Sequence, residues 1–221
     1  MKLEFNKNIL ITAGPTIEDI DPVRYITNRS SGKMGIALTK QALKIGANVT
    51  LIHGPLQVKI PKHEHLVSIY TRSAQEMLDA VLNNINSKDI AIFTAAVCDF
   101  RPESIASQKL KKDDSDNCPF TNIKWVKNPD ILATVGSLKS RPFLVGFAAE
   151  SENIIEHSKK KLQTKNCDLI CANDISNKNK GFEVDKNQVV LITIDKEICL
   201  PLLSKDATAK RILNFIRKTF L

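Results

Sequence analysis

Asn8-Ile-Leu-Ile-Thr12 is a short β-rich run that ends in the turn Ala13-Gly14-Pro15-Thr16. We expect a long polar loop after this turn, up to about residue 30. Ser30-Ser31-Gly32 then begins an amphipathic helix, because apolar residues recur at helical spacing as far as Ile45. Gly46 is a plausible residue to end that helix. A strand, a glycine-containing turn and a helix in this order are typical of α/β proteins.

The same alternation continues along the rest of the chain. The run at 89–96 is apolar throughout, which is typical of a strand buried in a parallel sheet. The pattern predicts one domain over residues 1–221, with a Rossmann-like, three-layer α/β fold, a mostly parallel sheet and a C-terminal antiparallel hairpin. Further strands are expected at 49–52, 66–70, 142–147, 168–172, 188–194 and 197–200, and further helices from Ser73, from 128–130, at 151–165 and at 204–220.

Composition narrows the class of ligand. The 221 residues include 32 Lys and Arg against 24 Asp and Glu, a formal net charge of +8. This excess attracts anions, and we favour phosphorylated small molecules over nucleic acid because aromatic residues that could stack on bases are few. No leader-like or membrane-spanning apolar stretch is present, so a cytoplasmic protein with five reduced cysteines is expected. No cysteine or histidine spacing predicts metal ligands.

Ligands of such a sheet bind beyond the carboxyl ends of its strands. That rule directs attention to residues 13–35, 95–101, 128–132 and 147–151, which are rich in small or polar residues directly after apolar runs.

The segment Asn28-Arg29-Ser30-Ser31-Gly32-Lys33-Met34-Gly35 is the strongest local signal. Glycines let a phosphate approach the backbone, and the free N–H groups and dipole of a helix start hold its charge. The alternative is an ordinary serine-capped helix. The segment is not a Walker A loop, because Met34 follows Gly32-Lys33 where Ser or Thr is required.

Two further segments offer chemistry. Asp99 follows the small residues Ala95 and Ala96 and can accept a hydrogen bond from an amino group, although it could equally be a turn residue. Lys109-Leu110-Lys111-Lys112 lies within a polar stretch at 100–127 that we expect to be a mobile loop. The lysines are either a cationic clamp for a triphosphate or a solvated charge run.

Taken together and in this order, these motifs resemble phosphopantothenoylcysteine synthetase, particularly its bacterial CTP-using type. The resemblance runs from about residue 8 to the end of the chain. Cys98 and Phe100 depart from the residues usual in the family. The motifs that carry the resemblance are ITAGPT at 11–16, IDPVRYITN at 20–28, SSGKMG at 30–35, AAV at 95–97, KLKK at 109–112, VKNPDI at 126–131, VGFAAE at 145–150, AND at 172–174 and SK at 204–205.

The resemblance implies a two-step ligation in coenzyme A biosynthesis. The carboxylate of 4′-phosphopantothenate attacks the α-phosphate of CTP, with Mg²⁺ or Mn²⁺ as cofactor, and the resulting acyl-cytidylate is then attacked by the amine of cysteine. It also implies a homodimer in which the lysine loop of one copy reaches the site of the other. A stand-alone synthetase is expected, so that the family's decarboxylase would be a separate protein.

The resemblance also implies roles for particular residues. Asn28 and Lys109 would be catalytic, and Asn28, Ala95 and Ala96 would contact phosphopantothenate. The nucleotide would be bound by Gly14, Ser30, Gly32, Gly35, Phe93, Thr94, Ala95, Asp99, Lys109, Pro129, Asp130, Ile131, Leu132, Phe147, Lys161 and Lys165.

Two other classes of protein share single features with this sequence. The glycine turns echo a short-chain nicotinamide oxidoreductase, but the Tyr-x-x-x-Lys pair of that class is missing, since Arg29 stands four residues after Tyr25 and Ala74 four after Tyr70. The net charge is the one feature that suggests a nucleic-acid-binding protein. We do not expect nucleic-acid binding to be the function.

Overall fold

The computed structural model describes residues 5–111, 120–150, 152–174 and 186–220. Its centre is an eight-stranded sheet in the order β13-β12-β10-β9-β6-β1-β4-β5. The six strands from β5 to β10 pair in parallel, and β12 and β13 add the expected antiparallel hairpin. The strands are β1 (Asn8–Ala13), β4 (Asn48–His53), β5 (Leu66–Tyr70), β6 (Ile90–Phe93), β9 (Phe143–Glu150), β10 (Leu169–Asp174), β12 (Val189–Ile192) and β13 (Glu197–Cys199).

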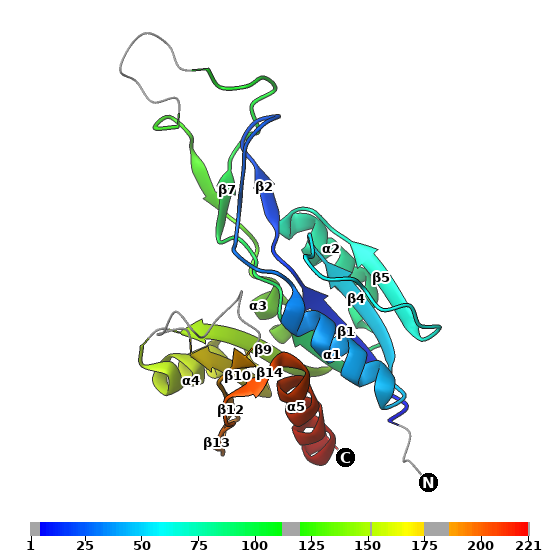
Figure 1. Cartoon of the computed structure of the whole chain (residues 1–221). Helices are drawn as coiled ribbons and strands as arrows, with labels where there is room; N and C mark the ends of the chain where they lie inside the picture. Colours follow the sequence, from blue (N-terminus) through cyan, green and yellow to red (C-terminus); the bar gives the residue numbers. More distant parts are fainter. Residues whose placement is uncertain (1–4, 112–119, 151, 175–185, 221) are drawn as a thin grey trace.

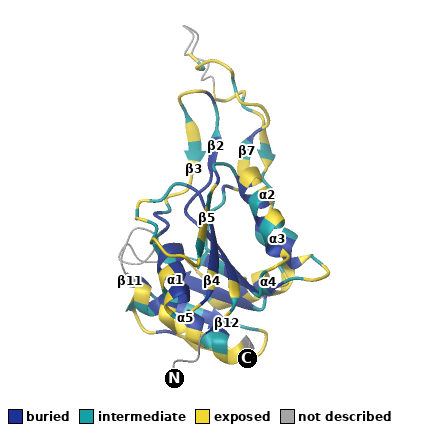
Figure 2. Ribbon diagram, turned by 90° about the vertical axis from the view of Figure 1, so that its right-hand side faces the viewer, coloured by how far each residue is buried: buried dark blue, intermediate teal, exposed yellow. Residues whose placement is uncertain are grey.

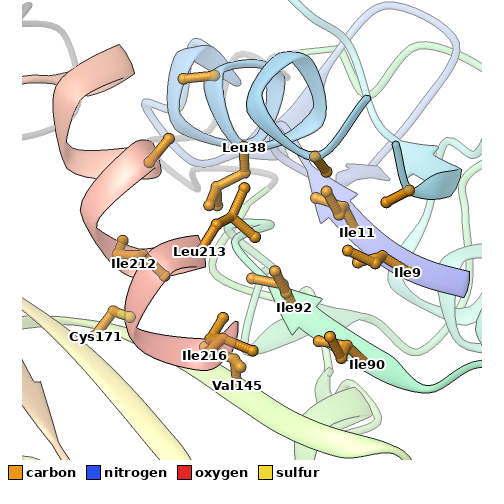
Figure 3. Packing of buried hydrophobic residues seen from close by; sticks show 14 of the residues in the cluster. Ile9, Ile11, Leu38, Ile90, Ile92, Val145, Cys171, Ile212, Leu213 and Ile216 are labelled. Atoms are coloured by element: carbon orange, nitrogen blue, oxygen red, sulfur yellow. The ribbon is translucent and has the colours of Figure 1, made fainter. Parts of the chain in front are cut away.

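Helices cover both faces of the sheet, which confirms the three-layer prediction (Figure 1). On one face lie α1 (Lys33–Lys44) and α5 (Lys205–Phe220), and on the other α2 (Ala74–Ile85), α3 (Ile131–Gly136) and α4 (Ile154–Thr164). Figure 3 shows Leu38 of α1 and Leu213 and Ile216 of α5 above the sheet residues Ile11 and Ile92. All five side chains are at most 2% exposed, so their burial stabilises this layer by about 1.5–3 kcal/mol each.

The chain order places a switch point between β1 and β6. From β1 the chain proceeds outward to β4 and β5, and from β6 it proceeds the opposite way to β9 and β10. Two loops that leave neighbouring strands in opposite directions open a crevice at the carboxyl ends of β1 and β6. The fold therefore fixes the position of a ligand site before any side chain is considered.

Two short ribbons stand directly beyond that crevice. β2 (Ile17–Asp19) pairs with β3 (Tyr25–Thr27), and β7 (Phe100–Pro102) pairs with β8 (Trp125–Lys127). Together with the described residues between their strands, 20–24, 103–111 and 120–124, they form a projection, here named the arm, that extends away from the sheet and its helices (Figures 1 and 2). The prediction of continuous loops after the turn at 13–16, up to residue 30, and at 100–127 was wrong at these strands. Residues 112–119, with Lys112, lie outside the described residues, and the mobility of this loop stays a prediction.

Helix starts follow side-chain caps where the sequence offers them. Ser73 caps α2 as predicted, its Oγ accepting a hydrogen bond from the Glu76 amide at 3.1 Å. Helix α3 begins later than predicted. Asp130 caps it by accepting from the Ala133 amide at 2.9 Å, so Pro129 precedes the cap and does not form the first helical residue.

Candidate active site

Two cavities meet at the switch point. The larger, about 580 Å³, lies over the start of α1 and is named the glycine-turn cavity. The smaller, about 470 Å³, lies against α3 and is named the α3 cavity. Ala95, Val97, Asp99 and Phe147 line both, so the two form one continuous site. Predicted residues in the first are Asn28, Ser30, Gly32, Gly35, Thr94, Ala95, Ala96, Asp99, Phe147 and Lys161; those in the second are Phe93, Ala95, Asp99, Pro129, Asp130, Ile131, Leu132 and Phe147.

The start of α1 is built by glycine. Gly32 is the N-cap residue in a left-handed conformation, with φ at 73°, and its cap has no side-chain hydrogen bond. The alternative of a serine-capped helix is therefore wrong. At Gly35 a Cβ would lie 2.5 Å from the Ala13 Cβ and 2.8 Å from the Thr94 hydroxyl, so only glycine lets the helix approach the strand ends this closely. In the first turn the Lys33 amide lies 3.5 Å from the Ser31 Oγ, and a helix start built in this way suits an anion.

Asn28 lies at the rim of the glycine-turn cavity. Its Nδ2 donates to the Ala96 carbonyl at 3.1 Å, which connects the end of β3 to the residues that follow β6. An amide nitrogen carries two hydrogens, so a second donor remains for a ligand. The Ala96 backbone is held in turn by Gly14, whose carbonyl accepts from the Ala96 amide at 2.9 Å. The acceptor that orients Asn28 is thus itself fixed.

The α3 cavity is mainly apolar. Phe93, Ile131, Leu132 and Phe147 supply its apolar side chains. Cys98 also lines it, but burial raises the pKa of this thiol, so it is poorly suited to act as a nucleophile. The cavity therefore combines apolar walls with polar side chains such as Asp99, Asn128 and Asp130.

The two predicted lysines of α4 and its C-cap differ in position. Lys161 lines the glycine-turn cavity and donates to the Glu150 carboxylate at 2.7 Å. Lys165, the C-cap residue, forms an ion pair with Asp130 but lines neither cavity. Lys161 can contact a ligand directly, whereas Lys165 stands behind Asp130.

Gly14 is not a wall of the site. It lies outside the lining of both cavities, and a Cβ added at Gly32 would be 3.5 Å from its Cα. With φ at 76°, Gly14 turns the chain beneath the start of α1. Gly14 therefore packs against Gly32 and does not face the ligand cavities.

Lys109 lies on the arm and lines neither cavity of its own chain. The neighbouring Leu110 is held from both sides: its amide donates to Asp21 at 3.1 Å, and its carbonyl accepts from Arg24 at 2.6 Å. Asp21 also pairs with Arg24, whose guanidinium holds the pKa of Asp21 well below its usual range. The backbone between Lys109 and Lys111 is therefore fixed while the Lys109 side chain is exposed.

Sequence reasoning assigned no role to several polar residues of the glycine-turn cavity. Arg29 and Lys33 belong to the predicted segment, but Asn173, Asn187 and Lys205 come from β10, from β11 (Lys186–Asn187) and from α5. Asn173 and Lys205 stand within motifs that carry the resemblance, but without a role, and nothing in the local sequence marks Asn187. Their proximity depends on the fold of the C-terminal third of the chain.

Fold and site define the class: a doubly wound α/β protein with two joined cavities at the switch point, one over a glycine-built helix start and one against α3. The family can also be given, because residues 5–220 match the model of the DNA/pantothenate metabolism flavoprotein C-terminal domain. The chain belongs to this family.

Individual relatives of the chain carry names from coenzyme A biosynthesis. The chain is 50% identical over 214 residues to the coenzyme A biosynthesis bifunctional protein CoaBC of Vibrio vulnificus strain YJ016, covering 96% of this chain and 52% of the relative. It is 46% identical over 210 residues to that of Escherichia coli K12, covering 95% and 51%. The chain thus spans about half the length of these curated relatives. A crystal structure of the C-terminal domain of a CoaBC protein matches with a TM-score of 0.80 at 40% identity, covering 96% of this chain and 95% of that one.

Proposed function

We propose that this chain joins 4′-phosphopantothenate to L-cysteine through an acyl-cytidylate, converting CTP to CMP and pyrophosphate. The observation that carries the proposal is the pair of joined cavities, in which an anion-binding helix start lies beside an apolar slot. The relatives named for coenzyme A biosynthesis support it, and the region that matches them includes both cavities.

The first step joins two anions. A carboxylate oxygen of phosphopantothenate attacks the α-phosphorus of CTP, and the bond from that phosphorus to the pyrophosphate oxygen breaks. The start of α1, with Ser30, Gly32 and Gly35, would hold phosphate oxygens, and Lys161 would add positive charge. The cytosine would occupy the α3 cavity, where Asp99 on the shared wall can accept from its amino group.

The second step builds charge on a carbonyl oxygen. The amine of cysteine attacks the acyl carbon, loses a proton, and CMP leaves with one oxygen of the former carboxylate. Asn28 would donate its remaining N–H to that developing oxyanion, and Ala95 and Ala96 would line the space for the acyl group. Neither step needs a nucleophile from the protein.

Mg²⁺ or Mn²⁺ would neutralise triphosphate charge during the first step. Among the described residues no three His, Cys, Asp or Glu side chains gather as ligands. The cavity walls nevertheless fit a metal held chiefly by phosphate and water, since the Asn173 amide carbonyl supplies an oxygen atom of the kind that such ions prefer.

We also propose that two copies act together. Lys109 stands on the arm beyond its own cavities, and the arm exposes Tyr25, Phe100, Ile105 and Trp125, a concentration of large apolar side chains that suits a contact with a second copy. In such a dimer Lys109 of one copy would serve the site of the other. We further propose that the decarboxylase of the pathway is a separate protein and that this chain acts in the cytoplasm. In the described part of the chain, no helix is long and apolar enough to cross a bilayer.

The proposal predicts that turnover with CTP greatly exceeds turnover with ATP. Asp99 on the wall of the α3 cavity would accept from the amino group of cytosine, and a purine would present its amino group at a different distance from the ribose. Release of pyrophosphate should be measured with phosphopantothenate and each nucleotide in turn. Equal turnover would contradict the base assignment. NAD(P)H binding, or salt-sensitive oligonucleotide binding, without pyrophosphate release would replace the ligase by one of the other two classes.

A further inference from the structure

Lys205 is a buried lysine on the wall of the glycine-turn cavity. It is the first residue of α5 and is only 8% exposed. Its Nζ donates to the Oδ1 of Asn187 at 2.7 Å. Lysines are almost never buried to this extent unless the ammonium group meets suitable partners, so its position at a ligand cavity is informative.

Two buried amides accompany Lys205. Asn187 is 4% exposed and lies on β11, which Figure 2 shows beside α1; its Nδ2 approaches the Sδ of Met34 in the first turn of α1 at 3.9 Å. Asn173, at the end of β10, is 8% exposed, and among the described residues its Oδ1 has no hydrogen-bond partner. A buried acceptor without a donor is costly, and a ligand in the cavity would supply one.

The three side chains share one location. All line the glycine-turn cavity, none lines the α3 cavity, and they approach the start of α1 from the side of β10 and α5. A cation, a neutral amide and an open carbonyl oxygen suit a phosphate that carries bound water or a hydrated metal ion, because the phosphate accepts and the water donates.

We propose that Lys205, with Asn187 and Asn173, forms the subsite for the two terminal phosphates of the nucleotide, the part that leaves as pyrophosphate. This inference rests on the proposed function. The base lies in the α3 cavity and the α-phosphate at the junction of the two cavities, so the terminal phosphates extend to the opposite end of the glycine-turn cavity. Asn187 holds the lysine ammonium, and the helix start and Lys205 contact the leaving group from two sides.

Calorimetric titration of wild type and Lys205→Gln with CTP, CMP and inorganic pyrophosphate, each with Mg²⁺, tests the subsite. The variant should bind CTP and pyrophosphate about tenfold more weakly or worse, because one charged contact is lost. Its affinity for CMP should stay within about twofold, since CMP lacks the terminal phosphates. Lys40→Gln, an exposed lysine of α1 outside both cavities, is the matched control and should bind all three like wild type.

The outcomes are distinct. If Lys205→Gln loses affinity for CTP and CMP to the same extent, or keeps its affinity for CTP, the subsite is overturned. Neither result affects the proposed function. Wild type that binds neither CTP nor CMP overturns the proposed function. If the variant does not fold, chemical labelling of lysine amines in the wild-type protein replaces the titration. CTP and pyrophosphate should protect Lys205 from labelling, and CMP should not. Equal labelling of Lys205 under all conditions would contradict the inference.

Discussion

Replacing Lys109 by glutamine is expected to slow cytidylate formation about 100-fold or more, as for the loss of one group that stabilises transition-state charge. The side chain is exposed, while the adjacent Leu110 backbone is fixed by Asp21 and Arg24, so the lysine is presented at a defined point of the arm. Single-turnover release of pyrophosphate measures the step. A variant that matches wild type would show that the run is merely a solvated loop.

A mixing experiment separates action within one chain from action across a dimer. Lys109→Gln and Asn28→Asp are each expected to form very little product alone. If Lys109 serves the partner's cavity, each mixed dimer has one intact site, and re-equilibrated mixtures should regain roughly a quarter of wild-type activity. No recovery in a mixture that demonstrably contains mixed dimers would place Lys109 at the site of its own chain, or outside the mechanism.

Replacing Asn28 by aspartate is expected to separate the two half-reactions. The carboxylate is nearly isosteric with the amide but offers no donor and would repel the oxyanion formed when cysteine attacks. Pyrophosphate release that depends on CTP and phosphopantothenate should persist in part, whereas product should nearly disappear. The acyl-cytidylate should accumulate on the enzyme and be detected by mass spectrometry after a quench.

Asn84→Asp is the matched control for this substitution. The Asn84 Nδ2 donates to a backbone carbonyl, that of Ala80, at 2.8 Å, as Asn28 does to Ala96, but on α2 and outside both cavities. It should leave both half-reactions unchanged. Equal failure of both steps in Asn28→Asp would mean that the hydrogen bond to Ala96 shapes the turn. Full product formation would remove Asn28 from the mechanism.

The central sheet could be predicted because its strands are continuous apolar runs between helices of clear periodicity. The arm could not: β2, β3, β7 and β8 have three residues each, and exposed side chains such as Tyr25 and Trp125 interrupt any apolar alternation. Each ribbon forms because the switch point brings its two ends together, which is a tertiary cause that the local sequence does not express.

The site divides in the same way. Residues directly after β1 and β6, such as Gly35 and Asp99, were predictable because the carboxyl ends of parallel strands meet at one edge. Asn187 and Lys205 reach the same cavity through a short ribbon, β11 with β14 (Leu203–Ser204), and through α5. The resemblance implied that Lys109 serves the site of a second copy, and the structure places it on the arm, outside both cavities of its own chain.

The acyl-cytidylate route is tested most directly by isotope transfer. Phosphopantothenate labelled with ¹⁸O in both carboxylate oxygens should be converted with CTP, Mg²⁺ and cysteine, and the products examined by mass spectrometry. Because the carboxylate attacks the α-phosphorus and CMP departs with one of its oxygens, CMP should gain one ¹⁸O and the amide product should retain the other. The account would be contradicted if ¹⁸O appeared in pyrophosphate or in inorganic phosphate. It would also be contradicted if product formed and CMP carried no ¹⁸O.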